Sequence, residues 1–171
     1  MRKTKRYPVS GANSLWHVYD TVPFWKVVKN FVFIQSARYS PVLSWKNFIY
    51  RTFLKMEVGK ETSFALMVMV DVMFPERIKV GANSVIGYNT TILAHEYLID
   101  EYRIGDVIIG DRVLVGANTT ILPGITIGND AIVSAATLVN KDVPEGCFVG
   151  GNPMRIIYTK EQMQERKGKN I

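Results

Sequence analysis

Aliphatic residues recur every six positions between Val107 and Pro144 of this chain. The series consists of Ile109, Val115, Ile121, Ile127, Val133 and Val139. A small or branched residue follows four positions after each of them: Val113, Thr119, Ile125, Ala131, Thr137 and Val143. An α-helix repeats about every 3.6 residues and a strand about every 2, so this period fits neither. A fixed short repeat is typical of a solenoid. One short strand and one corner per unit predict a triangular coil with the aliphatic residues pointing inward.

The same period continues upstream at Val80, Ile86 and Ile92. Asparagines, which tolerate a left-handed backbone, stand at four expected corners: Asn83, Asn89, Asn118 and Asn129. The step from Ile92 to Ile109 is 17 residues, which is not a multiple of six. Residues 94–106 are therefore expected to leave the coil as a loop, and loops on a rigid scaffold commonly carry function. Residues 71–77 form a second irregularity.

Residues 1–57 precede the repeat and carry helical patterns. One apolar face combines Phe24, Val27, Val28, Phe31 and Ile34. A second helix is predicted to begin with Ser40 as its cap and Pro41 in its first turn. Its apolar stripe comprises Val42, Trp45, Ile49, Phe53 and Met56, and Lys46, Arg51 and Lys55 lie off that stripe. We expect three regions: a basic, amphipathic helical cap over residues 1–57, the β-rich coil over 58–158, and a tail with a short polar helix over 159–171.

Composition and charge narrow the class of protein. A chain of 171 residues with 47% hydrophobic residues suits a single domain with a real core. Its one cysteine, Cys147, excludes an intrachain disulfide framework, and no signal peptide is visible, so we expect a cytoplasmic protein. Residues 1–57 contain ten Lys/Arg and two Asp/Glu, a net charge of +8, and the remainder contains eleven and thirteen, a net of −2. No nucleic-acid-binding module accompanies this charge, so we expect no nucleic-acid partner.

Two segments resemble the hexapeptide-repeat acyltransferases, most closely the maltose and galactoside O-acetyltransferases. The first spans residues 110–129 and includes Leu122-Pro123-Gly124, and the second is Gly151-Asn152-Pro153-Met154-Arg155-Ile156 with its flanks. The resemblance covers about residues 58–158. It implies a left-handed parallel β-helix, a homotrimer, acetyl-CoA as the acyl donor, and active sites between subunits.

The resemblance places the catalytic base at His95, at the start of the interrupting segment. A hydroxyl group is a poor nucleophile until a base accepts its proton, and an imidazole with a pKa near ~6.5 suits that task at neutral pH. Glu96, Asp100 and Glu101 are candidates to orient the ring. Adjacent side chains in extended backbone point apart, which disfavours Glu96, and a main-chain carbonyl is an equal alternative.

The donor site is expected at four further positions that match the family. Ala117 and Ala135 correspond to positions beside the pantetheine arm, and Lys141 and Arg155 to cations that meet the phosphates of CoA. Ala117 stands where serine is common. With only His17 and His95 in the chain, no metal site is expected.

Three departures from the sugar enzymes leave the acceptor open. Met67 replaces a usual asparagine, Leu114 replaces a frequent aromatic residue, and the segment after His95 is shorter. We expect acetyl transfer from acetyl-CoA to a hydroxyl of a sugar or glycan-type acceptor. The alternatives are N-acetyl or longer-chain acyl transfer on the same scaffold, or a non-catalytic scaffold docked at a membrane. Residues 1–57 are a candidate for peripheral contact with the inner membrane surface.

Overall fold

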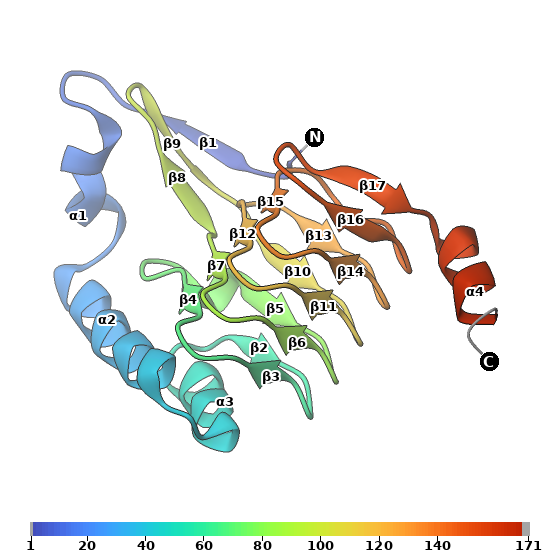
Figure 1. The fold of residues 1–171 in the computed structure, drawn as a ribbon. Helices are drawn as coiled ribbons and strands as arrows, with labels where there is room; N and C mark the ends of the chain where they lie inside the picture. The colour runs from blue at the N-terminus through green and yellow to red at the C-terminus, as the bar shows by residue number, and fades with distance from the viewer. Residues whose placement is uncertain (1, 169–171) are drawn as a thin grey trace.

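The computed structural model describes residues 2–168, which form a parallel β-helix of three sheets with helices at both ends (Figure 1). Sheet 1 contains β2 (Glu57–Val58), β5 (Ile78–Val80), β10 (Val107–Ile109) and β13 (Thr126–Ile127). Sheet 2 contains β3 (Ser63–Phe64), β6 (Val85–Ile86), β11 (Leu114–Val115), β14 (Ile132–Val133) and β16 (Phe148–Gly150), with β17 (Arg155–Tyr158) antiparallel at its end. Sheet 3 contains β4 (Met69–Val70), β7 (Thr91–Ile92), β12 (Thr120–Ile121) and β15 (Leu138–Val139). The chain visits sheets 1, 2 and 3 in turn, so each circuit is one triangular coil.

The predicted six-residue period describes the core of this coil correctly. All six aliphatic residues from Ile109 to Val139 are buried, as are Val80, Ile86 and Ile92 upstream. The second series, from Val113 to Val143, is buried as well. Equivalent residues pair in register on successive coils, for example Val115 with Ile86 on one side and Val133 on the other. The interior is therefore a stack of aliphatic layers.

The corners from sheet 1 to sheet 2 and from sheet 2 to sheet 3 follow one rule, in which the third residue after the inward residue has a left-handed backbone. The non-glycine residues at this position, with φ between 52° and 64°, are Glu61, Met67, Asn83, Asn89, Arg112, Asn118, Asp130 and Ala136. Three of the four predicted asparagine corners are thus confirmed. The fourth was assigned one residue early: Asp130 takes the left-handed conformation, and the Asn129 side chain instead accepts a hydrogen bond from the N–H of Asp111.

Residues 94–106 leave the coil as predicted, but as an ordered hairpin. β8 (His95–Tyr97) pairs antiparallel with β9 (Glu101–Ile104), and the far edge of β9 pairs with β1 (Lys5–Pro8) (Figure 1). The expectation that residues 1–57 are helical is therefore wrong for this strand. β1 forms because β9 presents an unpaired edge whose backbone groups require partners.

Two helices cover the open end of the first coil. The described chain continues from β1 through η1 (Ser14–His17) and α1 (Val18–Thr21) into α2 (Phe24–Tyr39) and α3 (Leu43–Thr52). α3 lies against β2 and β3, and α2 lies against β4 (Figure 1). α3 begins at Leu43, not at Pro41, and Ser40 instead ends α2 while its hydroxyl accepts the N–H of Val42.

The basic residues of these helices satisfy the carbonyl groups of the first coil. Several N–H groups of each coil donate to carbonyls of the next coil, as Ser63 does to Ser84, so the equivalent carbonyls of the first coil have no preceding coil to accept from. Side chains of the cap donate to them: Arg51 to Val58 and Gly59, Asn47 to Thr62, Lys46 to Phe64 and Ala65, and Arg38 to Met67. These bonds replace the ladder that a preceding coil would supply. Much of the N-terminal positive charge therefore has a structural role.

Lys46 corrects the predicted stripe of the second helix. Its side chain lies between Ile49 and Tyr50 on the buried face and is only 1% exposed. Val42 and Trp45, which the stripe placed inside, are exposed. The first helix was also assigned partly wrongly, because Ile34 is buried whereas Phe24 and Phe31 are exposed.

The other end of the described chain carries α4 (Lys160–Gly168), which confirms the predicted short helix up to residue 168. The last part of that prediction, at Lys169, lies outside the described residues. Within residues 2–168, no helix combines the length and apolar character required to cross a bilayer.

Candidate active site

His95 and Asp71 form a hydrogen-bonded pair at one edge of the β-helix. Nδ1 of His95 donates to Oδ2 of Asp71 over 2.6 Å. The Asp71 side chain is 0% exposed and that of His95 is 15% exposed. Since an ionised carboxylate can only accept, Nδ1 carries the proton and Nε2 of the neutral ring has a free lone pair. Nε2 forms no hydrogen bond with the described residues, so it remains available as a base.

The repeat places these two residues together. Asp71 follows β4 and Ala94-His95 follows β7, so both leave sheet 3 at its edge toward sheet 1, on successive coils. Val70 and Ile92, the last residues of the two strands, are paired in register. Both predicted irregularities of the repeat therefore start at this edge. η2 (Pro75–Arg77) follows Asp71, and the hairpin begins at His95.

Four hydrogen bonds hold the Asp71 carboxylate. Oδ1 accepts the N–H groups of Met73 and Phe74, and Oδ2 accepts the N–H of Ala94 as well as the imidazole. Burial alone would raise the pKa of Asp71, but the hydrogen bond and charge of His95 and the N–H groups of Phe74 and Ala94 outweigh it, so the pKa is lowered. The carboxylate is thus ionised and fixed before any substrate binds.

Aromatic rings surround the imidazole and connect it to the N-terminal segment. The His95 ring makes edge contacts with Phe74 and Tyr97, at centroid distances of 5.9 and 5.2 Å. The Tyr97 hydroxyl lies 2.8 Å from the hydroxyl of Thr21, at the end of α1. These contacts restrict the orientation of the ring, and burial raises the pKa of Tyr97.

The carboxylates suggested by their nearness to His95 in the sequence have other partners. Glu96 points to the opposite face of β8 and pairs with Arg2 over 2.6 Å. Glu101 pairs with Arg103, and the backbone carbonyl of Asp100 accepts the N–H of Val9. None of the three contacts His95. Asp71, which stands at the second irregularity of the repeat, is the partner of His95 that the sequence pattern alone does not predict.

Ala117 and Ala135 occupy equivalent corners between sheets 2 and 3 on successive coils. The backbone N–H of each donates to no described residue. Ala135 is exposed, and the coil below approaches it so closely that a Cβ on Gly116 would lie 2.4 Å from its nitrogen. A free backbone N–H group of this kind can donate to a carbonyl group of a bound molecule.

Lys141 and Arg155 are both exposed cations. Neither forms an ion pair with a carboxylate among residues 2–168. The turn that leads to Arg155 is fixed beside the Ala135 corner, because Gly151 bonds to Thr137 and to Leu138. Both side chains are therefore free of a carboxylate partner and accessible to an anionic ligand.

One chain does not bring all five predicted site residues together. Ala117 and Ala135 stand where sheet 2 passes to sheet 3, whereas His95 and Lys141 stand where sheet 3 passes to sheet 1. Sheet 3 separates the two edges. Of the two remaining departures, Met67 stands at the first-coil corner between sheets 2 and 3, where its backbone bonds to Arg38, and Leu114 is exposed on sheet 2.

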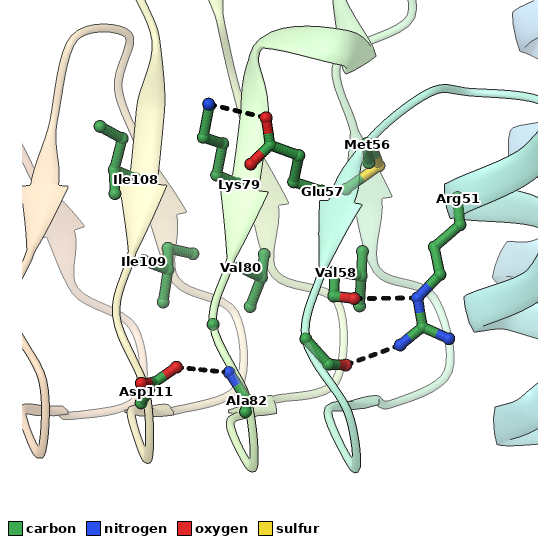
Figure 2. A pocket seen from close by; sticks show the side chains of 12 residues that line it. Arg51, Met56, Glu57, Val58, Lys79, Val80, Ala82, Ile108, Ile109 and Asp111 are labelled. Carbon is green, nitrogen blue, oxygen red and sulfur yellow. Dashed lines mark hydrogen bonds and ion pairs between the residues drawn. The ribbon is translucent and has the colours of Figure 1, made fainter.

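A groove of about 640 Å³ lies on the outer side of sheet 1, beside α3 (Figure 2). Its polar groups bind one another: Lys79 pairs with Glu57, Arg51 holds the carbonyls of Val58 and Gly59, and Asp111 accepts the N–H of Ala82. None of the predicted site residues lines it, so we assign it no chemistry.

Comparison with known proteins shows which family the chain is similar to. A family model described as the hexapeptide repeat of succinyl-transferase matches residues 106–141. YvoF of Bacillus subtilis (strain 168), which carries the provisional name of an acetyltransferase, is 75% identical over 170 residues, covering 99% of both chains. The similarity therefore includes the N-terminal helices, the hairpin and the coil.

Two solved structures share the fold. A hexapeptide-repeat acetyltransferase of Vibrio cholerae, VCA0836, complexed with acetyl-CoA, gives a TM-score of 0.67 at 22% identity over 79% of this chain and 87% of that one. A galactoside acetyltransferase complexed with coenzyme A gives 0.65 at 19% identity, over 80% and 81%. The predicted left-handed parallel β-helix is confirmed.

Proposed function

Because this chain belongs to the hexapeptide-repeat acetyltransferases, we propose that it transfers an acetyl group from acetyl-CoA to a hydroxyl of a sugar or glycan-type acceptor. The observation that carries the proposal is the 2.6 Å hydrogen bond from His95 to the buried Asp71 carboxylate, which leaves Nε2 as an unpaired base. With one cysteine in the chain and acetyl-CoA as donor, we place the reaction in the cytoplasm.

In the proposed reaction, Nε2 of His95 accepts the hydroxyl proton while the acceptor oxygen attacks the thioester carbonyl carbon. Asp71 stabilises the resulting imidazolium through Nδ1, and general-base assistance of this kind contributes about 10²–10⁴ in rate. As the carbon–sulfur bond breaks, the imidazolium returns its proton to the departing thiolate. The products are the acetyl ester and CoA with a free thiol.

The donor is proposed to lie against the Ala135 corner. The free N–H groups of Ala117 and Ala135 meet the pantetheine arm, and Lys141 and Arg155 meet the phosphates. Since sheet 3 separates His95 and Lys141 from the alanine corners within one chain, we propose that a neighbouring subunit supplies these two residues to each site. A homotrimer, which has closed rotational symmetry, provides three such sites.

The decisive experiment mixes the purified protein with acetyl-CoA and measures thiol release across a panel of sugars, glycans and amines. We expect release with a hydroxyl acceptor, and a fall of at least about 10²-fold for His95→Ala with unchanged acetyl-CoA binding. Release with amines alone would replace the hydroxyl proposal with N-acetyl transfer. Full turnover by His95→Ala would refute the assignment of the base.

A further inference from the structure

The outer side of the helical cap is apolar, although no described residue covers it. On α2, the side opposite Asn30, Ile34 and Ala37 carries an exposed set of large residues: Phe24, Trp25, Phe31, Val32 and Tyr39. We call these five residues the outer face of α2. A helix that is apolar on two sides is normally buried on both, so this face is expected to have a partner.

The neighbouring helix extends this surface. Val42, Leu43, Trp45 and Phe48 are exposed at α3 and its start, and the Trp45 and Phe48 rings stack at 5.5 Å. At the other end, Phe24 makes edge contacts with both Tyr19 and Trp25. The exposed apolar surface therefore runs across both helices that cap the coil.

All three tryptophans of the chain belong to this N-terminal region and are exposed. Trp16 is 80% exposed, Trp25 is 76% exposed and Trp45 is 46% exposed. Tryptophan is a large apolar residue that is usually well buried, and it is enriched where a surface meets the headgroup region of a bilayer. Its concentration on the cap favours an interfacial partner.

The charge around the surface is positive. No Asp or Glu occurs between Thr21 and Met56. Lys46, Arg38 and Arg51 donate to carbonyls of the first coil, but Lys29 and Lys55 remain exposed, and neither pairs with a carboxylate within residues 2–168. Exposed aromatic residues beside uncompensated cations suit an anionic lipid surface.

We propose that the outer side of α2 and α3 docks on an anionic membrane, with the aromatic residues in the headgroup region and the cations near lipid phosphates. The same face of a second copy is a poorer partner, because a two-fold symmetric contact would bring two sets of unpaired cations together. The proposal does not depend on acetyl transfer, and it leaves the His95 edge of the coil free for chemistry.

The test is sedimentation of the whole protein with vesicles of phosphatidylcholine, with and without phosphatidylglycerol. We expect binding at least about tenfold stronger to the anionic vesicles, weakened by salt. Tryptophan emission should shift to the blue on binding. In single Trp→Phe variants, the shift should diminish for Trp25 and Trp45.

Matched variants separate the possible outcomes. Vesicle binding should fall by at least about tenfold in each of two double variants, Phe31→Ser with Val32→Ser and Lys29→Gln with Lys55→Gln. Val85→Ser, which changes an exposed aliphatic residue on sheet 2, should not. Light scattering must show an unchanged oligomer in all variants. Absence of binding to anionic vesicles at low salt overturns the proposal. The proposal is also overturned if the double variant Phe31→Ser with Val32→Ser dissociates the oligomer, because the outer face of α2 would then be a contact between subunits.

Discussion

Oδ2 of Asp71 accepts two hydrogen bonds, from Nδ1 of His95 at 2.6 Å and from the N–H of Ala94 at 2.7 Å. One carboxylate oxygen therefore fixes both the proposed base and the backbone that carries it. Asp71→Asn replaces an acceptor with an amide that also donates, so it cannot satisfy all four donors. We expect kcat to fall by about 10²–10⁴ with little change in the KM for acetyl-CoA.

Glu96→Gln is the matched control for that substitution. Glu96 is also a carboxylate next to His95, but it pairs with Arg2 and does not contact the ring. Its kcat should stay within about twofold of the unmodified protein, since an amide oxygen can still accept from Arg2 and the side chain does not bond to the imidazole. Equal losses in the two variants, or full kcat in a folded Asp71→Asn protein, would show that Asp71 does not position the base.

Asp71 should also make the stability of the fold depend on acidic pH. Its folded pKa lies below the ordinary value of 3.8, so the unfolded chain binds the proton more readily. The stabilisation is present above that ordinary value and is lost as the pH falls through the lowered folded pKa. In urea titrations from neutral pH to about pH 3, the stability gap between the unmodified protein and Asp71→Asn should narrow. A gap that stays constant with pH would contradict this.

Tyr50 carries a buried hydroxyl group that forms no hydrogen bond within the described residues. Leaving such a group unpaired costs about 1–3 kcal/mol, so Tyr50→Phe should increase the free energy of unfolding by at least about 1 kcal/mol. The substitution keeps the edge contact with Phe64.

Burial raises the pKa of Tyr50, so the unmodified protein should lose stability as the pH rises above about 10. The Tyr50→Phe variant should lose less stability over the same range. Guanidinium titrations at neutral and alkaline pH measure the free energy of unfolding of both proteins. A Tyr50→Phe protein that is less stable than the unmodified protein would contradict the prediction.

The sequence predicted the coil well because its signal is local and repeated. Each buried position is set by a six-residue frame that recurs from Val80 to Val143, so single exceptions do not hide it. The corner rule could also have been refined from the sequence, since Asp130 stands three residues after Ile127 just as Asn118 does after Val115. The handedness came only from the resemblance.

The partner of His95 was missed because it depends on two interruptions of that frame. The paired residues Val70 and Ile92 are 22 residues apart, one coil of 18 plus four extra residues around η2, and Asp71 and His95 follow them by one and three residues. Only the three-dimensional register shows that both interruptions leave at one edge. Lys46 was misplaced for a similar reason. Its ammonium group donates to the carbonyls of Phe64 and Ala65 in the first coil. The six-residue period does not show which coil is the first, so it does not show that these carbonyls need a donor.

Lys141 and Arg155 should act on donor affinity alone. Exchanging either for Glu replaces attraction to a phosphate with repulsion, and a charged hydrogen bond contributes about 1.5–3 kcal/mol, so the KM for acetyl-CoA should rise about tenfold or more at unchanged kcat. Acetyl-pantetheine, which lacks the nucleotide phosphates, is the control donor and should be used equally well by all three proteins. Equal losses with both donors would assign these residues a structural role.

Ala135 and His95 should function from different chains. Ala135→Pro removes the free N–H, and the turn should accept it: Ala135 precedes the left-handed Ala136 just as Pro123 precedes the left-handed Gly124. We expect a raised KM for acetyl-CoA and a melting temperature close to that of the unmodified protein. Mixed oligomers of Ala135→Pro and His95→Ala chains, obtained by co-expression, then contain some sites with both intact residues. Turnover at low acetyl-CoA should exceed that of either variant alone. If the mixed oligomers are no more active than the parents, His95 and Ala135 of one chain serve the same site, and the proposed site between subunits is wrong.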